Sequence, residues 1–241
     1  KILIVGSSNT DLVVKTDHSP APGETILGED CIMAAGGKGA NQAVAAARLG
    51  GDVAFIASVG DDMFGKQSLD NFAREKMDCS HIKTVPGASS GIALICVDKD
   101  GENRIVVAPG TNYMLKPEDV SEDVIPADGF VLMQLEIPIE TIESVAAKAK
   151  AKGAKVVLNP APATPLSEKL LDGLYMITPN RGECATRTGI PTDTDEGLEK
   201  AMCRFLELGV KNVVVTLGSK GSCWKNAEGS GKVATMKVKA V

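Results

Sequence analysis

Short runs of apolar residues alternate along the chain with longer segments in which apolar positions recur every three or four residues. The apolar runs have the length of buried strands and lie at 1–6, 52–60, 130–136, 155–159 and 212–218. The segments with helical spacing lie at 41–50, 65–77, 141–153 and 197–209. Strand–helix–strand repetition with nearly continuous apolar strands predicts an α/β fold, in which a parallel sheet is covered by helices on both faces.

Two segments break this alternation. Residues 10–37 contain strand-like pieces but no helix, and residues 91–110 are two strand-like runs around the turn "DKDGEN". Together they predict a small antiparallel sheet that projects from the core and acts as a lid or a subunit contact, although an ordinary edge hairpin would give the same pattern. The chain shows no repeat and no linker, so a single domain over 1–241 is expected.

Composition narrows the function classes. The net charge is −5 and only 3% of the 241 residues are aromatic, which argues against a nucleic-acid-binding surface. No apolar run reaches the ~18 residues of a membrane span, and no signal peptide is evident. The six cysteines lack metal-binding spacing, and His18 and His81 lack motif partners. We therefore expect a cytoplasmic protein with free thiols and a small-molecule substrate.

Polar residues follow several predicted strands, where ligands bind in open parallel sheets. Asn9 and Asp11 come after the first strand and share a face if the chain is extended there, so they can grip vicinal hydroxyl groups. Read alone, they also fit a turn with local side-chain hydrogen bonds. Glu136 adds a carboxylate at the end of a later strand.

The stretch "AAGGKGANQAVAAARLG" (34–50) looks like a phosphate-binding loop that opens a helix. It fails the P-loop pattern because Gly39 follows Lys38 where Ser or Thr is required, and it fails GxGxxG because Gln42 occupies the third glycine position. A tight turn remains at Gly37, with Lys38 and Asn41 beside it and the positive end of a helix behind it. These groups suit either phosphate or sugar hydroxyls.

A second set of polar residues lies further along the chain. Asn180 and Glu183 stand at i and i+3, which suits a hydrated or phosphate-bound Mg²⁺, but also fits a capped helix N-terminus. The loop after the strand at 212–218 contains hydroxyl and backbone N–H donors that suit a nucleotide phosphate. Its candidate residues are Thr216, Gly218, Ser219, Lys220 and Gly221.

These elements, in this order, resemble the ribokinase family, the phosphofructokinase B type of sugar kinases. The matching motifs are "GSSNTD", "PGET", "GGKGANQAVAAARLG", "VGDDMFG", "SSGIALICVDKDGENRIVVAPGTN", "LMQLEIP", "LNPAPA", "ITPNRGE" and "TLGSKG". They span almost the whole chain, and several together are highly specific. The resemblance implies a Rossmann-like core with a β lid, inserted at about 12–34 and 90–110, that pairs two subunits in a homodimer.

The resemblance also implies an activity: transfer of the ATP γ-phosphoryl group to D-ribose, giving ribose 5-phosphate. Its implied cofactors are Mg²⁺ with ATP and a monovalent cation such as K⁺. The implied ribose contacts are Asn9, Asp11, Gly37, Lys38, Asn41 and Glu136. Glu183 is implied for the metal, and the implied ATP-site residues are Asn180, Thr216, Gly218, Ser219 and Gly221.

One part of the family pattern is missing. In the family, a strand like "KVATMKVKAV" (232–241) leads into a Gly/Ala-Ala-Gly-Asp turn that supplies the anion hole and the catalytic Asp. The sequence stops at Val241, before that turn, so we assign no catalytic base and expect a longer parent protein. Two alternatives stay open: a kinase for another sugar or nucleoside, and a sugar-binding fragment or pseudokinase that lacks phosphoryl transfer.

Overall fold

The computed structural model describes residues 1–236, and the chain falls into two compact units. The first unit holds 1–121 and Glu136–Thr141, and the second holds Glu122–Leu135 and the residues from Ile142 onward. Among residues 1–236, every helix falls short of the length and apolar character that a membrane span requires.

The first unit is built on a buried pair of parallel strands. β1 (Ile2–Val5) pairs with β4 (Val53–Ile56), and α1 (Lys38–Arg48) packs against both. Every residue of β4 is buried, since α1 packs against the strand and the Phe55 ring packs edge-on against Phe72. The other elements of this unit are β5 (Ser58–Gly60), α2 (Met63–Phe72), β6 (Lys83–Val85) and the short 3₁₀ turns η1 (Gly110–Met114) and η2 (Pro117–Asp119).

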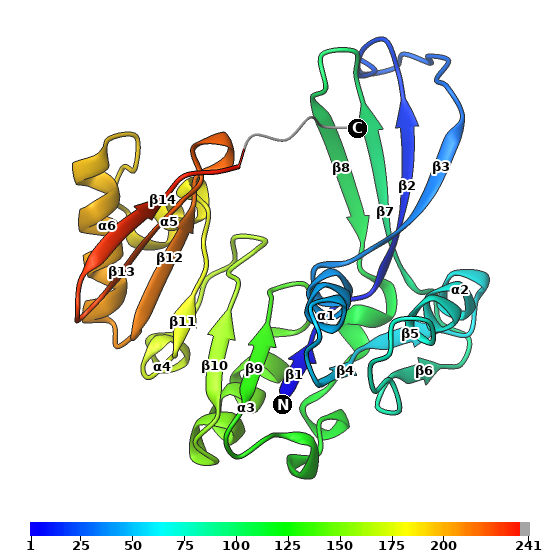
Figure 1. The fold of residues 1–241 in the computed structure, drawn as a ribbon. Coiled ribbons are helices and arrows are strands. Elements are labelled where there is room, and N and C mark those ends of the chain that lie inside the picture. The colour runs from blue at the N-terminus through cyan, green and yellow to red at the C-terminus, as the bar shows by residue number, and fades with distance from the viewer. Residues whose placement is uncertain (237–241) are drawn as a thin grey trace. The chain divides into compact units, whose positions relative to one another are not determined.

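A four-stranded sheet projects from this core (Figure 1). Its strands, in spatial order, are β3 (Cys31–Gly36), β2 (Asn9–Lys15), β7 (Gly91–Val97) and β8 (Asn103–Ala108). The outer pairs β2–β3 and β7–β8 are antiparallel, but the central pair β2–β7 is parallel. The predicted antiparallel sheet is therefore corrected to a mixed one, because the two hairpin-like halves lie side by side with their first strands in contact.

The second unit continues the α/β pattern. Its strands lie in the order β14–β13–β12–β11–β10–β9, with parallel pairing from β9 to β12 and antiparallel pairing from β12 to β14. The strands are β9 (Phe130–Met133), β10 (Lys155–Leu158), β11 (Met176–Ile177), β12 (Asn212–Thr216), β13 (Ser222–Asn226) and β14 (Ser230–Val233). The helical elements are η3 (Glu122–Val124), α3 (Ile139–Ala151), α4 (Glu168–Leu171), α5 (Arg181–Thr188), α6 (Asp195–Glu207) and the turn η4 (Gly218–Lys220).

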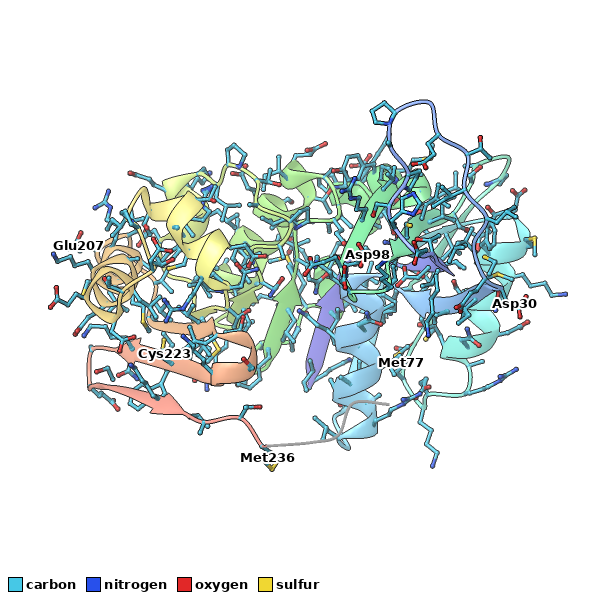
Figure 2. All side chains as sticks on the ribbon, turned by 90° about the horizontal axis from the view of Figure 1, so that it is seen from above. Asp30, Met77, Asp98, Glu207, Cys223 and Met236 are labelled. Atoms are coloured by element: carbon cyan, nitrogen blue, oxygen red, sulfur yellow. The ribbon has the colours of Figure 1, made fainter. Side chains whose placement is uncertain are left out.

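Helix α6 shows how sequence pattern becomes packing in this unit. Thr194 caps its first turn, and its side chains Leu198, Met202 and Phe205 are buried against the sheet. Figure 2 shows α6, which ends at Glu207, beside the hairpin that carries Cys223, and the Cys223 Sγ lies 3.7 Å from the Met202 Sδ.

The predicted boundaries differ from the observed ones in a regular way. The predicted strand at 52–60 breaks at Ala57 into β4 and β5, and β5 pairs with β6 in a separate two-stranded sheet. The four predicted helices begin two or three residues earlier than the apolar spacing indicated. In α2 and α6 the helix begins at the residue after its capping side chain, Asp62 or Thr194. The predicted strand at 232–241 appears only as the end of β14, and 237–241 lie outside the described residues.

Asp62 anchors the projecting sheet to the core. It caps α2 by accepting a hydrogen bond from Gly65 N at 2.8 Å, and it accepts two more from the Oγ (2.6 Å) and N (2.8 Å) of Ser90, directly before β7. Burial raises its pKa, but these hydrogen bonds outweigh burial and hold the pKa of the Asp62 carboxyl below its usual value.

We predict that Asp62→Ala lowers the free energy of unfolding by roughly 1–3 kcal/mol, since a helix cap and two bonds to Ser90 are lost. A depressed carboxyl pKa stabilises the fold above the unfolded pKa, and that contribution disappears as pH falls through the folded pKa. Denaturant titrations at pH 7 and pH 3 check this: the difference between wild type and variant should shrink at pH 3. Asp100→Ala, in an exposed turn, is the control.

Candidate active site

The first turn of α1 is held by groups from distant parts of the first unit. Gly37 is the N-cap residue, with a left-handed φ of 91° and no side chain to cap the helix. Instead, Glu136 Oε2 accepts hydrogen bonds from Lys38 N at 2.9 Å and from Ser7 Oγ at 2.5 Å. Ser7 also accepts from Gly39 N through its Oγ and from Ala40 N through its carbonyl.

This arrangement answers whether the loop at 34–50 binds phosphate. Asn41 N donates to the carbonyl of Gly37, so with the three bonds above all the free N–H groups of the first helical turn have acceptors. The carboxylate of Glu136 already occupies the place that an anion would take at a helix N-terminus. The backbone of this loop is therefore a rigid support, and the groups left for a ligand are side chains.

Gly39 makes that support possible. A Cβ on Gly39 would lie 2.5 Å from Ser7 N and 2.6 Å from the carbonyl carbon of Gly6, so the helix can approach the exit of β1 only with glycine there. Glu136 keeps its second carboxylate oxygen, Oε1, outside these contacts. The Lys38 side chain is half-buried, and Asn41 is exposed in the same turn.

Asp11 is a half-buried carboxylate on β2. Its carboxyl group lies over the backbone of Gly36, where an added Cβ would come within 2.2 Å of Asp11 Oδ1. Within residues 1–236 no hydrogen-bond donor reaches it. Burial, and then the negative charge of Glu136, raise the pKa of the Asp11 carboxyl above its usual value. Asp11 and Glu136 are thus close enough to interact electrostatically, and neither carboxylate forms an ion pair within residues 1–236.

Asn9 completes this group. It is buried, two residues before Asp11 on the same face of β2, and its Oδ1 accepts a hydrogen bond from Asn112 Nδ2 at 2.7 Å. The structure therefore brings together Asn9, Asp11, Gly37, Lys38 and Glu136. Ser7 and Asn112, which support them, were not identified from the sequence: a serine after a strand and an asparagine in "GTN" give no distinctive pattern.

The second set of predicted residues lies in the second unit. Thr216, at the end of β12, donates its N–H to the carbonyl of Pro179 at 3.0 Å and forms a bridge with Asn180. Asn180 and Glu183 form a capping box: Asn180 Oδ1 accepts from Glu183 N at 2.8 Å, and Glu183 Oε2 accepts from Asn180 N at 2.9 Å. The helix-capping alternative is thus realised, and it leaves Glu183 Oε1 available.

The loop after Thr216 is a tight turn with two open donors. Leu217 N bonds to the Gly221 carbonyl, Lys220 N to the Leu217 carbonyl and Gly221 N to the Gly218 carbonyl. The N–H groups of Gly218 and Ser219 have no acceptor within the described part of the chain. With the exposed hydroxyls of Thr216 and Ser219, they make an arrangement of donors that suits an anion.

The fold and these two groups of residues define a class of protein. It is an α/β protein with a mixed, mostly parallel sheet flanked by helices. The first unit carries acceptors that suit the hydroxyl groups of a polyol, and the second carries donors that suit an anion. The comparisons agree with this class. The profile of the pfkB family of carbohydrate kinases matches residues 1–241. The chain therefore belongs to the pfkB carbohydrate kinase family and has its ribokinase-like α/β fold.

Single relatives within this family are similar to the chain over most of its length. The chain is 45% identical to the ribokinase of Haemophilus influenzae over 222 residues, covering 91% of this chain and 72% of the relative. It is 35% identical to a deoxyribokinase of Salmonella typhi over 248 residues, covering 100% of this chain and 79% of the relative. The structure of Arabidopsis thaliana ribokinase complexed with ribose and ATP superposes with a TM-score of 0.89 at 32% identity, covering 100% of this chain and 79% of that one.

We predict that Asp11→Asn raises the thermal stability of the ligand-free protein at pH 8. A raised carboxyl pKa means that the charged form is penalised in the folded state, so removing the charge relieves a cost that sets in above the unfolded pKa and is complete above the folded pKa. The gain should fade as the pH falls through the raised folded pKa of Asp11 to pH 4. Thermal melts of wild type, Asp11→Asn and the exposed control Asp100→Asn at both pH values test this; an equal shift in both variants would contradict it.

Proposed function

We propose that this protein phosphorylates D-ribose with ATP, giving ribose 5-phosphate. The observation that carries the proposal is the group around Asp11: two carboxylates with open oxygens beside the Asn9 amide, and no donor from the described protein to satisfy Asp11. Vicinal hydroxyl groups would supply the missing donors. The Arabidopsis relative, which has the same fold, was solved with ribose and ATP.

The second unit supplies the nucleotide contacts in this proposal. The N–H groups of Gly218 and Ser219 and the Thr216 hydroxyl would bind ATP phosphates, Gly221 closes the turn that presents them, and Asn180 lies beside Thr216. Glu183 Oε1 would hold Mg²⁺ through water or phosphate oxygens, which Mg²⁺ prefers as ligands. No cluster of three or more His, Cys, Asp or Glu among residues 1–236 could hold a metal unaided.

The chemistry that these groups perform is positioning and charge stabilisation. Several bonds to the sugar hold its attacking hydroxyl in one orientation, and Lys38 offers a positive charge from the first turn of α1. We assign no base among residues 1–236 and expect the catalytic Asp after Val241. We place the reaction in the cytoplasm, where ATP is available and the six cysteines stay free, as they are in the structure.

The main alternative substrate is 2-deoxyribose, because one relative is a deoxyribokinase. The geometry favours ribose, since Asp11 and Glu136 place several acceptors in one region. A sugar that lacks a hydroxyl would leave a half-buried acceptor unpaired, and such mismatches are discriminated strongly.

We predict that Asp11→Ala weakens ribose binding by about tenfold or more, since both acceptors of that carboxylate are lost. Calorimetry with ribose, 2-deoxyribose and fructose on wild type, Asp11→Ala and the control Asp100→Ala tests binding. Transfer of ³²P from ATP to the same sugars by the full-length protein tests the reaction. Robust transfer to fructose or 2-deoxyribose without transfer to ribose would overturn the substrate assignment, and sugar binding without any transfer would favour the pseudokinase.

We further propose that the four-stranded sheet is a lid that pairs two copies of the chain as a homodimer. Large apolar side chains are exposed on both of its faces, among them Val106 (66%) and Leu94 (49%) on one face and Ile105 (51%) on the other. Register aligns them in rows across the sheet, Met33–Leu12–Leu94–Val106 and Ile32–Val13–Ile95–Ile105. Asp11 lies on the same face of the sheet as the second row. The bound sugar and the partner subunit together would therefore cover both faces of the sheet.

We predict that a glutamate in a row that contacts the partner subunit converts the dimer to a monomer, because its charge would be buried against apolar side chains. Val106→Glu tests one face and Ile105→Glu the other, with Leu49→Glu, an 89% exposed site on the core, as the matched control. Sedimentation velocity gives the oligomeric state. A wild-type monomer, or a dimer that survives both sheet variants, would contradict the proposal.

A further inference from the structure

Asn112, in the η1 turn that follows β8, is a buried side chain whose amide contacts three groups. Its Oδ1 accepts a hydrogen bond from Ser8 N at 2.9 Å. Its Nδ2 donates to the Ser8 carbonyl at 3.2 Å and to Asn9 Oδ1 at 2.7 Å. The Asn112 side chain is only 1% exposed, and burying a polar amide is favourable only when it is hydrogen-bonded, as it is here.

The backbone of Ser8 fixes which way the Asn112 amide points. A backbone N–H can only donate and a backbone carbonyl can only accept, so Oδ1 of Asn112 must face Ser8 N and Nδ2 must face Ser8 O. The same Nδ2 faces Asn9. Therefore the atom of Asn9 that meets it must be the acceptor Oδ1, which leaves the donor Nδ2 of Asn9 for other partners.

The strand next to β2 is shaped for this contact. Asn9 pairs with Gly91 on β7, and the hydrogen bond between Asn112 and Asn9 passes over that glycine. An added Cβ on Gly91 would lie 2.2 Å from Asn112 Nδ2 and 2.3 Å from Asn9 Oδ1. Any other residue at this position would push the two amides apart.

We propose that Asn112 is a positioning residue that sets the hydrogen-bonding polarity of the sugar site. It makes Asn9 present a donor, while Asp11 and Glu136 present acceptors. A hydroxyl between them can then accept a hydrogen bond from Asn9 and donate one to a carboxylate. If the Asn9 amide were reversed, Asn9, Asp11 and Glu136 would all present acceptors. This inference rests on the proposed sugar site and adds a residue that would not touch the sugar.

The decisive variant is Asn112→Asp. It keeps an oxygen for Ser8 N but has no donor for Asn9 or for the Ser8 carbonyl, so the Asn9 amide should turn and present its oxygen to the sugar. We expect the ribose Kd to rise about tenfold or more in this variant. In an Asn9→Ala background the same substitution should change the Kd by less than about twofold, because there is no amide left to orient.

The matched control is Thr111→Val, which is nearly isosteric. Thr111 is the neighbouring buried residue of η1, and its Oγ1 donates to the Ser58 carbonyl at 3.1 Å without contacting Asn9. Thr111→Val should lower the melting temperature but leave the ribose Kd within about twofold of wild type. If Asn112→Asp behaves like Thr111→Val, or weakens binding equally with and without Asn9, Asn112 is only an anchor and the proposal is wrong.

A ligand-free measurement separates this inference from the proposed function. In ¹⁵N spectra of the side-chain amides, assigned by loss of peaks in Asn112→Asp and Asn9→Asp, the Asn112 NH₂ should exchange slowly with water and the Asn9 NH₂ quickly. The opposite order would overturn the orientation whatever the protein binds. If the wild type shows this order but binds no ribose, the proposed function fails and the assigned polarity stands for another ligand.

Discussion

The N-terminus of α1 depends on a carboxylate that is distant in sequence. Because Gly37 has no side chain, Glu136 and Ser7 accept the N–H groups of the first turn, and Gly39 lets the helix come close enough for them to do so. This contact fixes α1 against the exit of β1. It also fixes the positions from which Lys38 and Asn41 extend, so the geometry of the candidate sugar site follows from one helix cap.

The same region carries an electrostatic cost. Asp11 is half-buried near Glu136, and no protein donor among residues 1–236 satisfies it, so the ligand-free protein holds a carboxylate in an unfavourable setting. Functional sites commonly accept such costs, since a group that the protein itself satisfied would have nothing left for a ligand. Asn9 differs, because one end of its amide is already held by Asn112.

The sequence predicted the buried strands, the main helices and most of the polar groups, because these depend on periodicity and on strand ends. It did not predict the parallel pairing of β2 with β7, since strand order in a projecting sheet depends on contacts far apart in the chain. It also missed Ser7 and Asn112: their roles come from partners 129 and 103 residues away, and no local spacing records them. The spacing of Asn180 and Glu183 fitted both a helix cap and a Mg²⁺ site. The structure forms the cap, which uses one carboxylate oxygen of Glu183 and leaves the other open.

The parallel pairing of β2 with β7 affects which positions of the four-stranded sheet can be substituted. Asn9 and Gly91 begin β2 and β7 at the root of the sheet, while the tips lie about 20 Å away, the length of a six-residue strand. The candidate sugar-site residues lie at the root, where a side chain on Gly36 or Gly91 would overlap Asp11 or Asn9. The outer two-thirds of each strand makes none of those contacts, so a substitution there that disturbs the pairing of two copies would leave the candidate sugar site unchanged.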